Sequence, residues 1–204
     1  MLYYLPFGRQ FLLFLENNMK TKILKTAFNL IGKKSVKDVS MREIAAACNI
    51  TKPSLYYYFK DKDDICYTII EHVLDDQNKK LKQYIEQNIS LKDILTDIFQ
   101  KVCKEKEKKS LAFFLHMIDY IKGVPALEKK FKPLKEENEK FAKEIFKREA
   151  QNKNIAQNKI ELAYYLFEAC LNYIVFAPIK LINVEPKDIA MSILKAIDYK
   201  NAED

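Results

Sequence analysis

The segment 52–59 carries the side chains of this chain best suited to binding a polyanion. If the segment is helical, Leu55, Tyr58 and Phe59 share one face at i, i+3, i+4 spacing and are expected to be buried. The side chains on the opposite face then point outward: Lys52, Pro53, Ser54, Tyr56 and Tyr57. Lysine and tyrosine can donate to phosphate oxygens, and proline and tyrosine rings can contact the methyl group of thymine.

These side chains need a support that presents the start of their helix to the outside. Ser40 and Glu43 match the S-x-x-E capping box, which predicts that a short helix begins just after Ser40. A three-residue turn, Cys48–Ile50, follows, and Thr51 is a suitable N-cap for the next helix. The alanines at 45–47 are small enough to let two helices cross closely, so the pattern predicts a helix-turn-helix over Ser40–Phe59.

The positive charge of the chain is concentrated around the same segment. The net charge is +7, and residues 19–62 hold ten Lys or Arg against three Asp or Glu, so this stretch accounts for the whole excess. A basic segment on a neutral body indicates a polyanionic partner, either a nucleic acid or an anionic membrane surface. A membrane binder remains possible on charge alone, but it would leave the pattern of 51–59 unexplained.

Helical periodicity extends along almost the whole sequence, and no strand-type alternation is present. The fold class expected is therefore all-α, with about nine helices in two unequal parts. The expected helices are 19–31, 40–47, 51–59, 63–88, 90–109, 110–123, 125–151, 154–177 and 185–199. We expect a helix-turn-helix domain at 19–64 and a larger helical domain at 65–204, joined through the long fourth helix.

Residues from Met19 to about Val73 resemble the DNA-binding domain of the tetracycline-repressor (TetR) family of bacterial regulators. The resemblance runs through Val39-Ser40-Met41-Arg42-Glu43-Ile44-Ala45 and Ile50-Thr51-Lys52-Pro53-Ser54-Leu55-Tyr56-Tyr57-Tyr58-Phe59. It covers about a quarter of the chain. Asn49 replaces the glycine that is common in the turn, but asparagine tolerates left-handed geometry and the turn is expected to persist.

The resemblance implies a role for each matching residue. Phosphate contacts fall to six polar or charged side chains: Ser40, Arg42, Thr51, Lys52, Tyr57 and Lys62. Contacts with base edges fall to three residues: Pro53, Ser54 and Tyr56. Lys62 would act at the start of the fourth helix, where the helix N-terminus also favours an anion.

Residues 90–204 match no specific motif, and two aromatic-rich helices stand out in them. Their aromatic side chains fit either core packing or a mostly apolar ligand cavity with a few orienting polar groups. Our ligand-site candidates are Phe113, His116, Met117, Asp119, Tyr120, Tyr165 and Tyr173. The resemblance also implies a homodimer formed through the eighth and ninth helices, using apolar residues of 171–177 together with Ile189, Ile193, Leu194 and Ile197. Burial of the same residues within one subunit is the alternative.

Other function classes have little support in the sequence. There is no glycine-rich phosphate loop, metal-ligand cluster or nucleophile–base pair, so we expect neither an enzyme nor a bound cofactor or metal. The four cysteines are widely spaced and fit buried apolar positions in a reducing cytoplasm. No apolar run is long enough for a membrane span. Residues 1–18 are either an upstream extension or an additional helix that packs on the body.

Together these features predict a cytoplasmic, homodimeric regulator that binds a pseudo-palindromic double-stranded DNA operator. The expected mechanism is repression that an unknown, largely apolar small-molecule effector relieves. The alternative is a DNA-binding protein that acts through a protein partner, without such an effector. The sequence identifies neither the effector nor the operator, and it does not separate a repressor from an activator.

Overall fold

The computed structural model describes residues 18–106, 109–176 and 184–196, and every regular element in these ranges is helical. The elements are α2 (Met19–Ile31), the 3-10 helix η1 (Val36–Asp38), α3 (Met41–Ala47), α4 (Lys52–Tyr58), α5 (Lys62–Glu86), α6 (Leu91–Lys106), α7 (Lys109–Lys122), α8 (Pro125–Lys153), α9 (Gln157–Phe176) and α10 (Pro186–Lys195). The all-α prediction is confirmed. The predictions made for residues 1–17, Ala177 and Ile197 lie outside the described residues.

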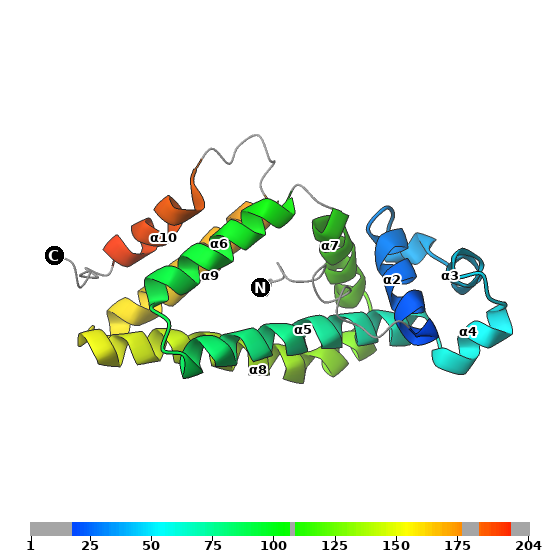
Figure 1. Cartoon of the computed structure of the whole chain (residues 1–204), viewed down its shortest axis with the longest axis horizontal. Coiled ribbons are helices and arrows are strands. Elements are labelled where there is room, and N and C mark those ends of the chain that lie inside the picture. The colour runs from blue at the N-terminus through cyan, green and yellow to red at the C-terminus, as the bar shows by residue number, and fades with distance from the viewer. Residues whose placement is uncertain (1–17, 107–108, 177–183, 197–204) are drawn as a thin grey trace. The chain divides into compact units, whose positions relative to one another are not determined.

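The described chain forms two compact units. The N-terminal unit comprises 18–77 and 109–136, and the C-terminal unit comprises 78–106, 137–176 and 184–196. The division falls within α5 and within α8, so both helices contribute to both units. Figure 1 shows the helices of each unit along the chain.

The core of the N-terminal unit is built from α2, α3 and α7. Ile23, Ala27 and Ile31 of α2 are completely buried. The ring of Phe28 stacks on Phe113 of α7 with 4.3 Å between ring centroids, so α7 packs against α2. The N-terminal unit is therefore larger than the 19–64 domain expected from the sequence, because the aromatic face of α7 is consumed in its core.

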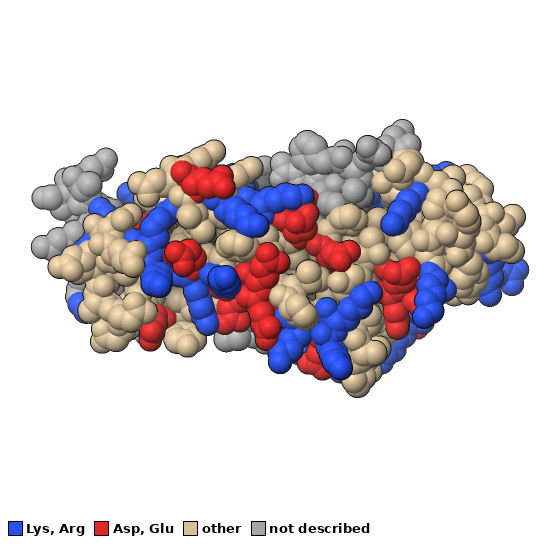
Figure 2. Space-filling model, turned by 90° about the horizontal axis from the view of Figure 1, so that it is seen from below, with Lys and Arg blue, Asp and Glu red and all other residues tan. Residues whose placement is uncertain are grey.

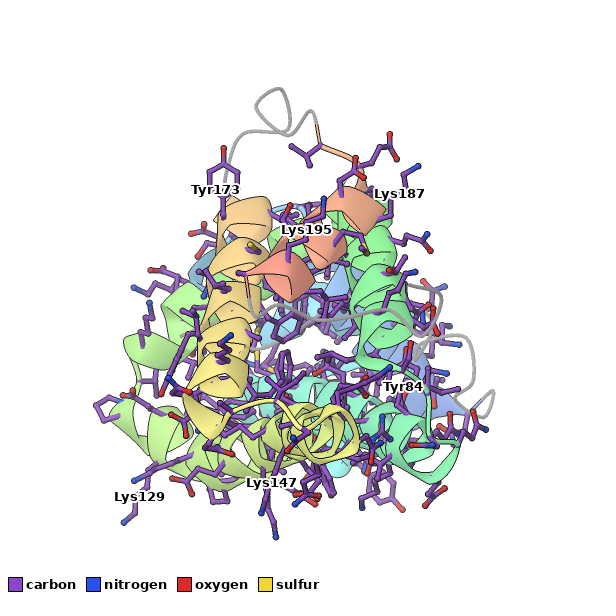
Figure 3. The ribbon with its side chains drawn as sticks, turned by 90° about the vertical axis from the view of Figure 1, so that its left-hand side faces the viewer. Tyr84, Lys129, Lys147, Tyr173, Lys187 and Lys195 are labelled. Carbon is purple, nitrogen blue, oxygen red and sulfur yellow. The ribbon has the colours of Figure 1, made fainter. Side chains whose placement is uncertain are left out.

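In the C-terminal unit, α10 packs on α6 and α9 (Figure 3). The apolar side of α10 is buried there through Ala190, Ile193 and Leu194, each at most 2% exposed. The rings of Phe99 on α6 and Phe167 on α9 meet at 5.9 Å. Ile193 and Leu194, which we expected at a subunit interface, are thus buried within one chain, as the alternative interpretation held.

Arg148 on α8 binds the end of α5 and the connection between α5 and α6. Its guanidinium donates to the carbonyls of Tyr84 and Ile85 at 2.9 and 3.0 Å, and it also donates to the carbonyl of Ile89. These carbonyls belong to the last turn of α5 and the connection to α6, and those of Tyr84 and Ile85 also accept from the N–H groups of Ile89 and Asn88 at 3.1 Å. The arginine therefore adds a charged donor at the C-terminal end of α5, where the helix dipole favours a positive charge.

Candidate nucleic-acid interface

The turn between α3 and α4 is held by side-chain caps and by one unusual backbone angle. Ser40 Oγ accepts from the backbone N–H of Glu43 at 3.1 Å, and Thr51 Oγ1 accepts from the N–H of Ser54 at 3.2 Å. Asn49 has a φ of 57°, as the replacement of glycine by asparagine predicted. The N–H of Ile50 then donates to the Ala45 carbonyl at 3.0 Å and closes the turn. The predicted helix-turn-helix geometry is confirmed.

Helix α4 buries one side and leaves the other exposed. Leu55 and the C-cap residue Phe59 are at most 2% exposed, and Tyr58 is half-buried. We call the other side the exposed α4 face, and it consists of Lys52, Pro53, Ser54, Tyr56 and Tyr57. Tyr56 is 44% exposed and Tyr57 is 84% exposed. Two adjacent tyrosines with this exposure have little packing role, so their aromatic surface is available to a partner.

The charges near the exposed α4 face are mainly positive. Arg42 and Lys60 are exposed, and Lys52 Nζ lies 5.7 Å from the ring centroid of Tyr56. The carboxylate of Glu43 accepts from Lys34 Nζ at 2.8 Å, and this hydrogen bond lowers the pKa of Glu43. By contrast, Lys/Arg and Asp/Glu side chains are interspersed over much of the α5 and α8 surface seen in Figure 2. The basic helix-turn-helix segment differs in this respect from the charge-balanced remainder of the chain.

Lys62, expected to contact phosphate, is engaged in the N-terminal unit. Its ammonium donates to the backbone carbonyls of Val36 at 2.6 Å and Val39 at 2.9 Å, with the Lys37 carbonyl at 3.5 Å. An ammonium has three N–H donors, and three carbonyls surround this one. Lys62 therefore holds the η1–α3 connection in place, and its contact with phosphate stays a prediction.

We expect Lys62→Met to lower the free energy of unfolding by about 1–3 kcal/mol, because two carbonyls lose a charged donor while the apolar stem is kept. Urea denaturation followed by circular dichroism measures this change. Lys60→Met, at an exposed position two residues away, is the matched control and should denature as the wild type does. A Lys62→Met protein of wild-type stability but weakened DNA affinity would instead favour the phosphate contact.

Five of the seven expected ligand residues lie on α7 in the N-terminal unit. Phe113 and Met117 are completely buried, and Asp119 is exposed. His116 Nδ1 lies 2.6 Å from the carbonyl oxygen of Ile31, which can only accept, so the imidazole donates there. His116 thus caps the end of α2.

Tyr120, the fifth of these residues, bonds to the start of α5. Its hydroxyl donates to Asp63 Oδ1 at 2.7 Å. Burial and the hydrogen bond to Asp63 raise the pKa of Tyr120, so the hydroxyl stays protonated and acts as a donor. The polar groups of α7 that we expected to orient a ligand therefore hold elements of the N-terminal unit together.

The two remaining candidates lie on α9 in the C-terminal unit. Tyr165 is 57% exposed and Tyr173 is 58% exposed, and Figure 3 shows Tyr173 extending outward near the end of α9. The seven residues are consequently not gathered around one cavity of the described structure. Their assignment to a ligand site remains a prediction. The geometry does not support treating the seven residues as one site.

A cavity that the sequence did not suggest lies in the C-terminal unit, with Glu168 of α9 in its wall. Glu168 is only 6% exposed, and it lies beside two buried aromatic residues of the same helix, Tyr164 and Phe167. A single acidic residue at i+4 and i+1 from buried aromatic residues was the available signal. Glu168 is not among the ligand residues predicted from the sequence.

Two properties hold for the described residues. None of their helices is both long and apolar enough to cross a membrane. They contain no group of three or more His, Cys, Asp or Glu side chains suited to holding a metal ion.

The segment that forms this interface matches known proteins. The model of the family described as "Bacterial regulatory proteins, tetR family" matches residues 23–66, from α2 to the first turns of α5. The uncharacterized HTH-type transcriptional regulator YerO of Bacillus subtilis (strain 168) is 31% identical over 74 residues, which are 36% of this chain and 25% of that protein. The HTH-type transcriptional regulator EthR of Mycobacterium tuberculosis (strain CDC 1551 / Oshkosh) is 28% identical over 82 residues, which are 40% of this chain and 38% of that protein.

These alignments span well under half the length of either relative, whereas the likeness of fold extends further. The TetR-family transcriptional regulator PfmR from Thermus thermophilus superposes with a TM-score of 0.66, covering 92% of this chain and 99% of that chain at 18% identity. The helix-turn-helix geometry, the matched segment and the likeness of fold agree with one another. Residues 23–66 are thus similar to the segment that the model of the tetR family of bacterial regulatory proteins describes.

Proposed function

We propose that this chain is a sequence-specific DNA-binding regulator that represses transcription and leaves its operator when a small-molecule effector binds. The observation that carries the proposal is the exposed α4 face, where two tyrosines, a proline and a lysine stand on a short, firmly capped helix. The N-terminal residues of a recognition helix are the ones that meet base edges in the major groove. The proposal requires the protein to meet the bacterial chromosome in the cytoplasm.

We assign roles within this interface by asking which side chains can still donate a hydrogen bond to DNA. Ser40 Oγ uses a lone pair to accept from Glu43, so its O–H remains able to donate to a phosphate. Arg42, Lys52 and Tyr57 add further donors to phosphate oxygens. Base contacts fall to the residues of the first two turns of α4, namely Pro53, Ser54 and Tyr56. Phosphate contacts position the helix, and the base contacts choose the sequence.

Selection of bound duplexes from a random double-stranded DNA pool, followed by footprinting, tests the proposal. A homodimer should select a pseudo-palindrome whose half-sites are about 10–10.5 base pairs apart, or a multiple of that spacing. Binding should also weaken steeply with salt, because bound phosphates release counterions. Failure to enrich any sequence, or enrichment of a single half-site without symmetry, would contradict the proposed dimeric regulator.

The dimer in this proposal uses α9. Three apolar side chains of that helix, Leu162, Tyr165 and Tyr173, are between 46% and 58% exposed, and their spacing places them along one side of the helix. Exposed apolar patches of this kind mark interfaces between proteins. The second helix expected at the interface, α10, contributes less, because its apolar side is buried within the chain.

A regulator that acts through a protein partner is the second candidate, and it makes no use of a small-molecule site. Thermal denaturation of the purified protein with a panel of metabolites separates the two. A ligand that binds only the folded state raises the melting temperature. A ligand that raises the melting temperature and also weakens operator binding supports the effector mechanism, whereas no response to any compound favours the protein partner.

A further inference from the structure

Helix α7 is bound to the rest of the N-terminal unit by polar contacts as well as by its aromatic core. His116 bonds to the carbonyl of the last residue of α2, and one turn later Tyr120 bonds to Asp63 in the first turn of α5. α7 lies beside α2 (Figure 1) and also packs against η1, the short helix that precedes α3. It therefore contacts the helices that precede and follow the helix-turn-helix in the sequence.

The side chain of Tyr120 lies between two oppositely charged residues that are adjacent in the chain. Its hydroxyl donates to Asp63 Oδ1 at 2.7 Å, and Lys62 Nζ lies over its ring, 5.7 Å from the centroid. A cation in this position is attracted to the face of the ring. Tyr120 thus gives the carboxylate of Asp63 a partner other than Lys62, and it gives the ammonium of Lys62 a favourable place.

Lys62 uses its donors on the connection that leads into α3. Its ammonium donates to the carbonyls of Val36 at 2.6 Å and Val39 at 2.9 Å. Val39 immediately precedes Ser40, the N-cap residue of α3, and Arg42 is the second residue of that helix. The ammonium therefore holds the point at which α3 begins, where two of the proposed phosphate contacts are placed.

We propose that Tyr120 is a positioning residue for DNA binding, which acts through Lys62 on the start of α3. While the hydroxyl binds Asp63, the ammonium of Lys62 is left to the backbone carbonyls of the η1–α3 connection. Without the hydroxyl, the carboxylate of Asp63 lacks that donor and competes for the ammonium, because opposite charges attract more strongly than a charge and a neutral carbonyl. The inference rests on the proposed function, since it adds a residue of α7 to what determines the DNA affinity of that interface.

Tyr120→Phe removes the hydroxyl and keeps the ring, so it tests this role with a small change in packing. We expect about fivefold to tenfold weaker binding to the selected operator and, by the same factor, to a duplex of random sequence, because phosphate contacts carry no sequence information. The slope of log affinity against log salt should fall by about one unit for a lost phosphate contact. Fluorescence anisotropy well below the melting temperature measures both quantities.

Tyr84→Phe is the matched control for the loss of a hydroxyl. It removes a tyrosine hydroxyl that donates to the carboxylate of Asp97, in the C-terminal unit. This control should keep the wild-type affinity and salt slope even if its melting temperature falls. A loss of stability in Tyr120→Phe would therefore not explain weaker binding.

A second substitution tests the proposed competition for Lys62. Asp63→Asn removes the competing charge, so in the Tyr120→Phe protein it should restore most of the lost affinity. Asp63→Asn alone shows how much of this gain comes from removing a negative charge near DNA. The gain should be larger in the Tyr120→Phe protein than in the wild type, because the two residues act on one contact.

Hydrogen exchange of the free protein follows the same effect without DNA. The N–H of Asp38 donates to the Ser35 carbonyl at 3.0 Å, and the N–H of Val39 donates to the Val36 carbonyl at 3.3 Å. Both amides should exchange severalfold faster in Tyr120→Phe, because local opening of η1 becomes easier. Their exchange should stay at the wild-type rate in Tyr84→Phe.

Wild-type operator affinity in Tyr120→Phe, or an equal gain from Asp63→Asn in both proteins, would overturn the inference. Exchange at wild-type rates in Tyr120→Phe would overturn it whether or not an operator is found. If the wild type selects no operator but the exchange of η1 is faster in the variant, the proposed regulator fails while the link from Tyr120 to η1 stands.

Discussion

Replacement of both Tyr56 and Tyr57 by alanine is expected to weaken binding to the selected operator by about two orders of magnitude, given ~1–3 kcal/mol for each specific contact with DNA. The melting temperature should hardly change. Tyr57 is 84% exposed and Tyr56 is 44% exposed, so neither ring contributes much to the core. Fluorescence anisotropy with a labelled operator duplex measures the affinity, and calorimetry measures the melting temperature of the same preparation.

Single variants divide this effect between base and phosphate contacts. Tyr56→Ala should change the preferred base at one position of each half-site, because Tyr56 is assigned to a base edge. Lys52→Ala should weaken all duplexes alike and reduce the slope of log affinity against log salt by about one unit. Lys129→Ala, which removes one exposed lysine of α8, is the matched control for charge. Wild-type affinity in the double tyrosine variant would show that the exposed α4 face does not bind DNA.

The helix-turn-helix could be predicted from the sequence because local interactions determine it. Ser40 and Thr51 cap their helices through backbone groups three residues away, and these bonds are present at 3.1 and 3.2 Å. The left-handed Asn49 and the burial of Leu55 likewise depend on close neighbours and on helical periodicity. The division of α4 into a buried side and an exposed face therefore followed from eight consecutive residues.

The roles of Lys62, His116 and Tyr120 could not be predicted in the same way. Lys62 donates to backbone carbonyls 23 to 26 residues earlier, and His116 bonds to a carbonyl 85 residues earlier. Backbone carbonyls occur at every residue, so no sequence pattern distinguishes these acceptors. Such contacts depend on how helices distant in the sequence pack together, and α7 illustrates this because its aromatic residues complete the core around α2 instead of lining a cavity.

The cavity at Glu168 depends on distant contacts in the same sense. Its walls come from four helices between Leu81 and Glu168, and the residues of each helix separately fit an ordinary amphipathic pattern. The sequence contained one local sign, an acidic residue on a buried aromatic face.

Which side of α9 a second subunit could cover also depends on contacts between residues distant in the sequence. Leu171 and Ile174 point into the C-terminal unit and are at most 3% exposed, so they are not available to a partner. The exposed apolar side of the helix instead consists of Leu162, Tyr165 and Tyr173. Tyrosine is enriched in interfaces between proteins because it combines a large apolar ring with a polar end. If a second subunit covers these side chains, a charge placed among them must be desolvated on association.

Glu substituted for both Tyr165 and Tyr173 is therefore expected to raise the dimer dissociation constant by at least about a hundredfold, corresponding to ~3 kcal/mol at 25 °C. The monomer should keep its melting transition, since both side chains are more than half exposed. Sedimentation equilibrium measures the dimer, and footprinting should show that protection of the paired half-sites is lost at protein concentrations sufficient for the wild type. Gln100→Glu, which adds a charge to an exposed position of α6, should remain dimeric. A dimeric Tyr165→Glu/Tyr173→Glu protein would exclude this side of α9 as the interface.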